Sequence, residues 1–219
     1  MRLLIILIFI NLTEGNSQIL PSFHGVHHKK EVIISGTINY KSYQTHYGNG
    51  SNSTYNGVTY SGVANSEAEF DAMFDTNQPG TTLTHSGEVS PYGSTGLRGG
   101  LPSRWGNDYF AIVYTGWFKP NKTGSYGFMG YADDGHQARY REVGTNTWQT
   151  MTYQWGCCSV VYGSGTLDSS KWYEFEIRYQ EYGGAAYYNF GYKIPSSSTY
   201  NWISSQHEFG TWTNVDPSN

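Results

Sequence analysis

The sequence predicts an all-β protein: an antiparallel β-sandwich with one short helix and long loops. The chain of 219 residues contains 20 tyrosines and 27 glycines, and only 14% of its residues are charged. Aromatic residues favour half-buried strands, and glycine favours turns and bulges. Short strand-like runs separated by turn signals also recur after Gly80, a pattern typical of a sandwich of antiparallel strands.

The N-terminal residues have the pattern of a secretory signal peptide. Arg2 precedes an apolar run that ends at Leu12, and small and polar residues follow. The run is far shorter than the roughly 20 apolar residues that span a bilayer. We therefore expect a signal peptide at residues 1–17, a polar arm at residues 18–31 and one β-sandwich domain at residues 32–219. An N-terminal membrane anchor is the alternative; otherwise the mature chain has no membrane span and is secreted or lies at the cell surface.

The first elements of the domain are a strand, a loop and the helix. Residues 32–40 (VIISGTINY) predict a strand, and residues 41–57 predict a long polar loop. Residues 66–75 (SEAEFDAMFD) predict the helix, because Ser66 and Glu69 form a capping-box pattern. The apolar residues of this segment share one helical face: Phe70, Met73 and Phe74.

Later residues predict strands almost throughout. The expected strands are residues 108–118, 124–132, 137–142, 146–155, 171–180 and 186–194. In residues 171–180, apolar residues from Tyr173 to Tyr179 alternate with Trp172, Glu174, Glu176 and Arg178, so one face is expected to be buried and the other solvated. Turns at residues 133–135 and 183–184 predict that the strands on either side of each turn pair as hairpins.

Charge, cysteines and glycosylation signals describe an extracellular protein. The net charge of −4 argues against nucleic acid as a partner, since nucleic-acid binders carry a clustered basic face. Cys157 and Cys158 are the two cysteines, and they can bond to each other, pair across chains or remain reduced. Asn49, Asn52 and Asn121 begin glycosylation sequons.

Two adjacent carboxylates, Asp133 and Asp134, interrupt the strand pattern in YADDGHQA (residues 131–138). Aspartate is disfavoured in strands, so the pair has either a turn role or a binding role. A solvated hairpin turn is one interpretation, and a divalent-cation site is the other, because Ca²⁺ takes six to eight oxygen ligands from carboxylates, amides, carbonyls and water.

The motifs around this pair resemble those of the PA14 domain, a β-sandwich of secreted lectins, adhesins, glycosidases and toxins. The turn PNKTGSYGF, the Asp-Asp-Gly motif, the strand KWYEFEIRY and the loop QEYGGAA occur in the family's order within residues 108–194. WGCCSV also resembles the adjacent cysteines of the yeast flocculins and epithelial adhesins.

The resemblance implies a calcium-dependent carbohydrate site. In the adhesins the two acids are joined by a cis peptide and hold Ca²⁺, which also coordinates sugar hydroxyls; here Asp133 and Asp134 take that place. A second loop would supply further oxygens, and in this chain it offers Gln180 and Glu181 where the adhesins have an asparagine.

Aromatic and glycine residues near these loops are candidates for ligand contact. Tyr182 lies beside Gly183 and Gly184, which are included in the predicted loop, and His136 and Trp155 are the other two ligand-facing candidates. Each has a structural alternative: His136 can simply follow the turn, and Trp155 can pack in the core or over the cysteines.

The predicted function is therefore that of a secreted, calcium-dependent lectin or adhesin domain, with glycans or glycoproteins as partners. The alternative is a structural subunit of an extracellular coat, appendage or filament, in which the chain self-associates and calcium is structural or absent. Catalysis is not expected, because no GxSxG, HExxH or Cys–His pattern is present, and glycoside hydrolysis requires two carboxyl groups that flank the scissile bond.

Overall fold

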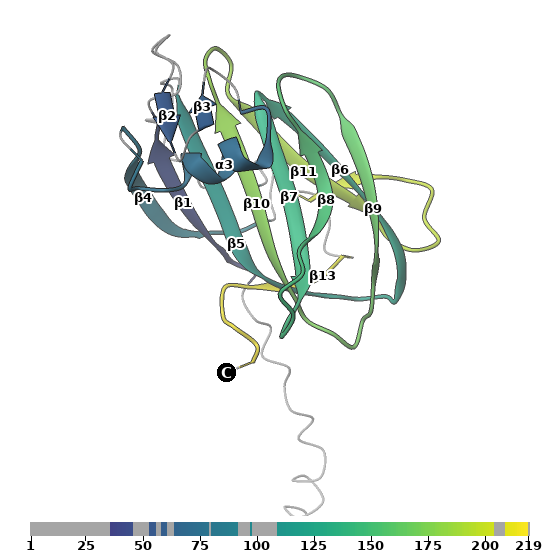
Figure 1. Cartoon of the computed structure of the whole chain (residues 1–219). Coiled ribbons are helices and arrows are strands. Elements are labelled where there is room, and N and C mark those ends of the chain that lie inside the picture. The colour runs from purple at the N-terminus through teal and green to yellow at the C-terminus, as the bar shows by residue number, and fades with distance from the viewer. Residues whose placement is uncertain are drawn as a thin grey trace, which may run out of the picture. The chain divides into compact units, whose positions relative to one another are not determined.

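Two antiparallel sheets stack into a sandwich in the computed structural model of the protein (Figure 1). The structure describes residues 36–45, 53–55, 58–60, 64–78, 80–91, 97, 109–203 and 209–218. The larger sheet has the strand order β4-β1-β5-β10-β7-β8, with β13 also paired to β5, and the smaller sheet has the order β12-β11-β6-β9. The predicted all-β sandwich is confirmed, whereas the predicted signal peptide and arm lie outside the described residues.

The strands of the larger sheet are β1 (Ile38–Gln44), β4 (Thr82–Val89), β5 (Phe110–Pro120), β7 (Gly135–Glu142), β8 (Gln149–Gln154), β10 (Tyr173–Glu181) and β13 (Gly210–Thr213). Those of the smaller sheet are β6 (Gly124–Asp133), β9 (Val161–Leu167), β11 (Tyr187–Lys193) and β12 (Asn201–Trp202). A separate hairpin pairs β2 (Ser53–Tyr55) with β3 (Val58–Tyr60), and the helix is α3 (Glu67–Met73). No helix of the described residues is long and apolar enough to cross a membrane.

The first strand lies later in the chain than predicted. β1 covers residues 38–44, so the polar segment 41–44 is strand and not the start of a loop; β2 lies inside the rest of the predicted loop, and β3 begins directly after it. Both neighbours of β1 explain the difference, because β4 and β5 pair with it along most of its length and bury Ser42 and Tyr43. Pairing on both sides outweighs the weak strand propensity of polar residues.

The predicted helix is confirmed, and its N-terminus is capped as the sequence indicates. The side chain of Ser66 accepts a hydrogen bond from the Glu69 N–H at 3.3 Å. The Glu69 carboxylate in turn accepts from the backbone N–H of Asn65 at 2.7 Å, which satisfies a second free donor at this end. The buried side of α3, including Phe70 and Met73, packs with Ala111 of β5 in a small apolar cluster on the outer face of the larger sheet.

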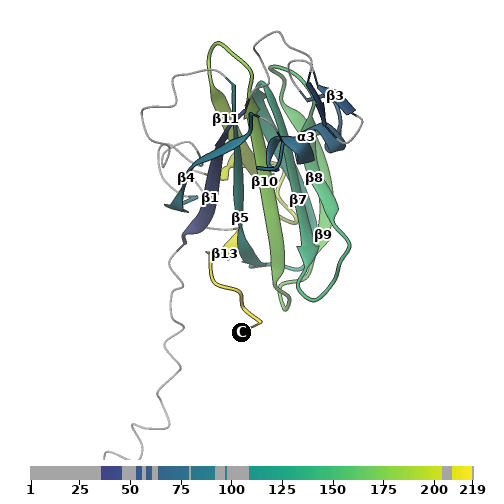
Figure 2. The ribbon, with the colours of Figure 1, turned by 60° about the vertical axis from the view of Figure 1, so that its left-hand side comes forward.

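That packing corrects the prediction of a solvated face on residues 171–180. Figure 2 shows α3 lying across the larger sheet beside β10 and β7. The side chain of Arg178 is consequently only 3% exposed, and those of Glu174 and Glu176 are 30% and 20% exposed. Alternation in one strand identifies two faces but does not show which distant element covers the polar one.

The two predicted hairpins are wrong, and the difference creates the site described below. β6 pairs with β9 and β11 in the smaller sheet, whereas β7 pairs with β10 and β8 in the larger. The chain also changes sheets between β10 and β11. Both short connections therefore cross between the sheets, and they do not close hairpins within one sheet.

Tyrosine rings make up much of the core between the sheets. Fully buried tyrosines direct their hydroxyl groups to polar partners at the ends of strands, which avoids an unsatisfied buried polar group. Tyr114 donates to the Leu97 carbonyl at 2.8 Å, and Tyr140 donates to Gln149 Oε1 at 2.8 Å. These hydroxyls thus reach loops and strand ends, whereas the Tyr188 hydroxyl is buried with no hydrogen-bond partner among the described residues.

Gly163 lies on β9 of the smaller sheet, where this strand closely approaches β8 of the larger sheet. A Cβ atom at residue 163 would overlap the backbone carbonyl of Met151 in β8, which cannot swing aside as a side chain can. Gly163→Ala should lower the free energy of unfolding by about 1–3 kcal/mol, measured by urea denaturation. Ser164→Ala, on the exposed side of the same strand, is the control and should change it by less than about 0.5 kcal/mol. Equal stabilities of the two variants would contradict the close approach.

Candidate functional site

Three connections between the sheets meet at one end of the sandwich and bring most of the predicted site residues together. Asp134 joins β6 to β7, residues 155–160 join β8 to β9, and residues 182–186 join β10 to β11. Gly135 pairs with Gln180 in the strand register, so these ends coincide, and Figure 1 shows the loops after β8 and β10 at the same end. Residues about 50 positions apart in the chain thereby become neighbours.

Asp133 and Asp134 lie where the chain passes from the smaller sheet to the larger. The peptide bond between them is cis, as the resemblance implies. The Asp134 N–H donates to the Gln180 carbonyl at 3.1 Å, and its Oδ2 accepts from the Tyr182 N–H at 2.6 Å. Burial raises the pKa of Asp134, and the charge of Asp133 adds to this; the N–H groups of Tyr182 and Gly183 act in the opposite direction. Asp134 is thus a buried carboxylate held by the loop that follows β10.

Glu181 adds a third carboxylate to this end. It is 1% exposed, and its Oε1 has no hydrogen-bond partner. Burial raises the pKa of Glu181 to about 7, and the charges of Asp134 and Asp133 also raise it, whereas the Tyr179 hydroxyl lowers it. That hydroxyl lies 2.9 Å from Glu181 Oε2 and 2.6 Å from the Asp133 carbonyl, and its one proton serves one acceptor at a time. We name Asp133, Asp134 and Glu181 the acidic cluster.

Gln180, predicted as a side-chain ligand beside Glu181, points to the other face of the strand. Its Oε1 accepts from the Ala64 N–H at 2.8 Å, and the residue is 0% exposed. The expectation of a Gln180 side-chain ligand is therefore wrong, because successive side chains of a strand point to opposite faces. Its backbone carbonyl still holds Asp134 in place.

The glycines of the second loop have a backbone role. The Gly183 N–H lies close enough to the acidic cluster to lower the pKa of both Asp134 and Glu181. Gly184 has a φ of 104°, a conformation that residues with a Cβ atom rarely adopt. The Gly-Gly pair therefore lets the loop turn back while its N–H groups face the carboxylates.

Cys157 and Cys158 bond to each other in the connection after β8. Cys157 Sγ lies 3.0 Å from Asp133 Oδ1, so the disulfide borders the acidic cluster. The two sulfurs and Asp133 lie within 4.8 Å of one another. Metal ions are bound by thiolates, and a disulfide has none, so Asp133 is the only ionic ligand of this group.

Tyrosines flank the acidic cluster on both sides. The Tyr182 N–H donates to Asp134, which places Tyr182 beside the cluster, and its ring meets that of Tyr109 edge to face with centroids 5.6 Å apart. Tyr187 lies opposite Asp133 in the strand register and packs against Tyr131 at 5.3 Å. Tyr187 is 38% exposed, and the sequence analysis did not select it. Its position next to the same glycine loop is the signal that could have identified it.

The other two predicted ligand-facing residues pack against neighbouring elements. His136 is 0% exposed between the sheets, where Nε2 lies 3.2 Å from Thr152 Oγ1, and burial lowers its pKa to about 3. Trp155 packs against Phe70 of α3, with ring centroids 4.9 Å apart. Complete burial shows that the expectation of a ligand-facing His136 is wrong, whereas Trp155 is half-buried and its ligand contact stays a prediction.

The predicted glycosylation sites lie away from the acidic cluster or outside the described residues. Asn121 is exposed in the connection between β5 and β6, at the opposite end of these strands from Asp133. Asn49 and Asn52 fall outside the residues that the structure describes.

Comparisons with known proteins identify the fold. No known family model matches the chain, and no curated protein sequence matches it. Among solved structures, the chain is similar to the A domain of epithelial adhesin 9 from Candida glabrata in complex with Galβ1-4GlcNAc, with a TM-score of 0.56 and 14% identity over 86% of this chain and 94% of that one. The chain has a PA14-like fold.

A second adhesin domain has the same PA14-like fold. The A domain of epithelial adhesin 6 from Candida glabrata, solved with Galβ1-3GlcNAc, is 15% identical and has a TM-score of 0.52. The alignment covers 83% of this chain and 89% of that one. Sequence identity at this level shows a shared architecture and leaves the binding properties to be argued from the site.

The acidic cluster predicts an unusual pH dependence of stability in the metal-free protein. Glu181 has a pKa of about 7 in the folded chain and 4.5 as the ordinary value. A raised carboxyl pKa means that the folded chain favours the protonated form of Glu181. The contribution of Glu181 to stability is therefore greatest below pH 4.5 and falls as pH rises to about 7, by at most about 1.4 kcal/mol per pH unit. Urea denaturation with a chelator at pH 5 and pH 8 measures this fall.

Glu181→Gln should remove this contribution, and Glu88→Gln, an exposed carboxylate on β4, should leave it unchanged. A fall of the same size in wild type and Glu181→Gln would contradict the assignment to Glu181.

Proposed function

We propose that the protein binds glycans through a calcium ion held by the acidic cluster. The observation that carries the proposal is the buried, unpartnered Oε1 of Glu181 beside Asp133 and Asp134. Three carboxylates in a confined site repel one another, and a divalent cation relieves both the repulsion and the missing hydrogen bond. The donor set, all oxygen, suits Ca²⁺ rather than a metal that prefers sulfur or nitrogen.

The residues around the cluster would have two roles, ligating the ion and holding its ligands in position. Asp133, Asp134 and Glu181 would ligate the ion, and the Gln180 carbonyl and the Tyr182 N–H would hold Asp134 in position. Bound calcium supplies positive charge and open coordination positions that sugar hydroxyls can fill. Tyr182 and Tyr187 flank the cluster, where an aromatic ring can cover the apolar face of a sugar.

The fold supports a glycan as the ligand class. The adhesin domains to which the chain is similar were solved with galactose-containing disaccharides. With the predicted signal peptide, this supports a secreted or cell-surface protein of lectin or adhesin type with no catalytic role. We keep this proposal ahead of the structural-subunit alternative, because the acidic cluster at the converging connections is a feature that a ligand explains.

Calcium should stabilise the protein through Asp134. At a free Ca²⁺ concentration of 100 times Kd, the gain in free energy of unfolding is about 2.7 kcal/mol. Asp134→Asn should abolish most of this gain in thermal or urea denaturation, whereas Glu88→Gln, which removes the same charge from the exposed strand β4, should retain it. An Asp134→Asn variant that calcium stabilises as much as wild type would exclude the site.

Glycan binding should require the ion and the neighbouring ring. A glycan array probed with calcium should give signals that vanish with a chelator and in Asp134→Asn. Tyr182→Ala should weaken binding of the same glycans by about tenfold, the value of one aromatic contact near 1.4 kcal/mol. Tyr162→Ala, which removes a 64% exposed ring from β9, is the control and should bind as wild type. Signals that persist in chelator would refute calcium-dependent recognition.

A further inference from the structure

A hollow lies on the outer face of the larger sheet, beside α3. Its cavity volume is about 330 Å³, which is within the range of small-ligand pockets. Val113 and Thr115 of β5 form its floor, and Lys41 and Tyr43 of β1 form one wall. We name this hollow the β5 trough.

The strand register explains why the trough forms. In one row across the sheet, Val113 has Lys41 on one side and Arg178 on the other; in the next row, Thr115 lies beside Glu176. Neighbouring strands are about 4.8 Å apart, so long charged side chains stand on both sides of a strand that carries only short ones. The space above β5 is left open between them.

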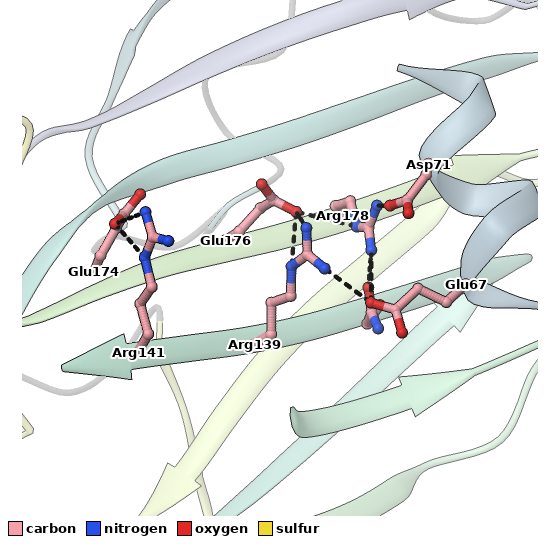
Figure 3. Close-up of polar contacts among 8 residues, drawn as sticks. Glu67, Asp71, Arg139, Arg141, Glu174, Glu176 and Arg178 are labelled. Carbon is pink, nitrogen blue, oxygen red and sulfur yellow. Dashed lines mark hydrogen bonds and ion pairs between the residues drawn. The ribbon is translucent and has the colours of Figure 1, made fainter. Parts of the chain in front are cut away.

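An ionic network forms the opposite wall, as Figure 3 shows. Arg178 forms an ion pair with Asp71 of α3, and its Nε lies 3.2 Å from Glu176 Oε1. The Arg139 guanidinium lies 2.8 Å from Glu176 Oε1 and 2.8 Å from Oε1 of Glu67 on α3. The four charged residues of this wall that line the trough carry two positive and two negative charges and hold one another in place. With Glu67, the network has three carboxylates and two guanidinium groups, so the wall is preorganised and carries no excess of positive charge.

The first wall and the floor differ, because their polar groups are free. The Lys41 ammonium and the hydroxyl groups of Tyr43 and Thr115 line the trough, and none has a hydrogen-bond or ion-pair partner within the part of the chain that the structure describes. Lys41 is exposed, and its ammonium is the one charge of the lining that no ion pair within the described residues offsets. A matching ligand would bring one negative charge, and its other polar groups would meet the two hydroxyls.

We propose that the β5 trough binds a carboxylated monosaccharide, a hexuronate unit. The ligand carboxylate would pair with Lys41, and its ring hydroxyls would meet Thr115, Tyr43 and the carboxylate of Glu176. The apolar face of the ring would lie over Val113. A neutral sugar would leave Lys41 unpaired, and a small carboxylate would leave the apolar floor and the hydroxyl groups unused, so the combination of charge and hydroxyls identifies the class.

Chemical-shift titration of the isotope-labelled protein with D-glucuronate tests this proposal. Glucuronate should produce saturable shifts at residues of the trough, and D-glucose and acetate should each bind at least about tenfold more weakly, as expected for loss of a charge-assisted contact or of the ring contacts. Raising the salt concentration should weaken glucuronate binding.

Substitutions of Lys41 test the proposal without disturbing the fold, because its side chain is exposed. Lys41→Gln should weaken glucuronate binding at least about tenfold, and Lys41→Arg should restore most of it. Lys122→Gln removes the same charge from the exposed connection between β5 and β6 and should bind as wild type. Glucose binding as tight as that of glucuronate, acetate binding as tight as that of glucuronate, or equal binding by Lys41→Gln and Lys122→Gln would each overturn the proposal.

The Asp134→Asn variant distinguishes ligand binding in the β5 trough from ligand binding at the acidic cluster. The β5 trough contains no residue of that cluster, so glucuronate binding should survive this substitution and the addition of chelator. Loss of glucuronate binding in both cases would place the ligand at the acidic cluster and overturn the trough. Failure of calcium to stabilise the protein would refute the proposed function and leave the trough unaffected.

Discussion

The hydrogen bond from the Asp134 N–H to the Gln180 carbonyl is the contact on which the site depends. It forms at the point where β6, in the smaller sheet, gives way to β7, in the larger. The Tyr182 N–H completes the link by donating to the side chain of the same aspartate. These two hydrogen bonds join the connection between β6 and β7 to the connection between β10 and β11. Carboxylates from distant parts of the chain thereby share one buried place.

The tyrosine-rich core continues into the site. Tyr179 stacks on Tyr188 between the sheets, with centroids 5.4 Å apart and the ring planes inclined by 22°. The hydroxyl of Tyr179 leaves the apolar layer and reaches the Asp133 carbonyl and Glu181. A phenol has an apolar ring and one polar tip, so a single residue serves as core and as support for the acidic cluster. A phenylalanine would pack there and leave Glu181 without this neighbour.

Local patterns were sufficient to predict the sandwich and the capped helix, and the resemblance to the PA14 domain pointed to Asp133, Asp134 and Glu181, which the structure brings to one end of the sandwich. Local patterns failed where a distant element decides the outcome. The turn at Asp133–Gly135 has the sequence of a hairpin, yet the partner of each flanking strand is chosen by strands tens of residues away. His136 directly follows the turn, and only the packing of the second sheet shows that its ring is buried. Gln180 failed for a local reason, since it points to the opposite face from its neighbour Glu181.

The two proposed sites respond differently to mechanical load. Asp133 ends a strand of the smaller sheet, and Glu181 ends a strand of the larger. Sliding of one sheet over the other would separate these carboxylates. An ion bound to both carboxylates would resist this movement. The β5 trough, by contrast, has its strands in one sheet and would keep its shape under the same movement. The proposed ion would thus contribute to the cohesion of the two sheets, and the proposed ligand of the trough would not.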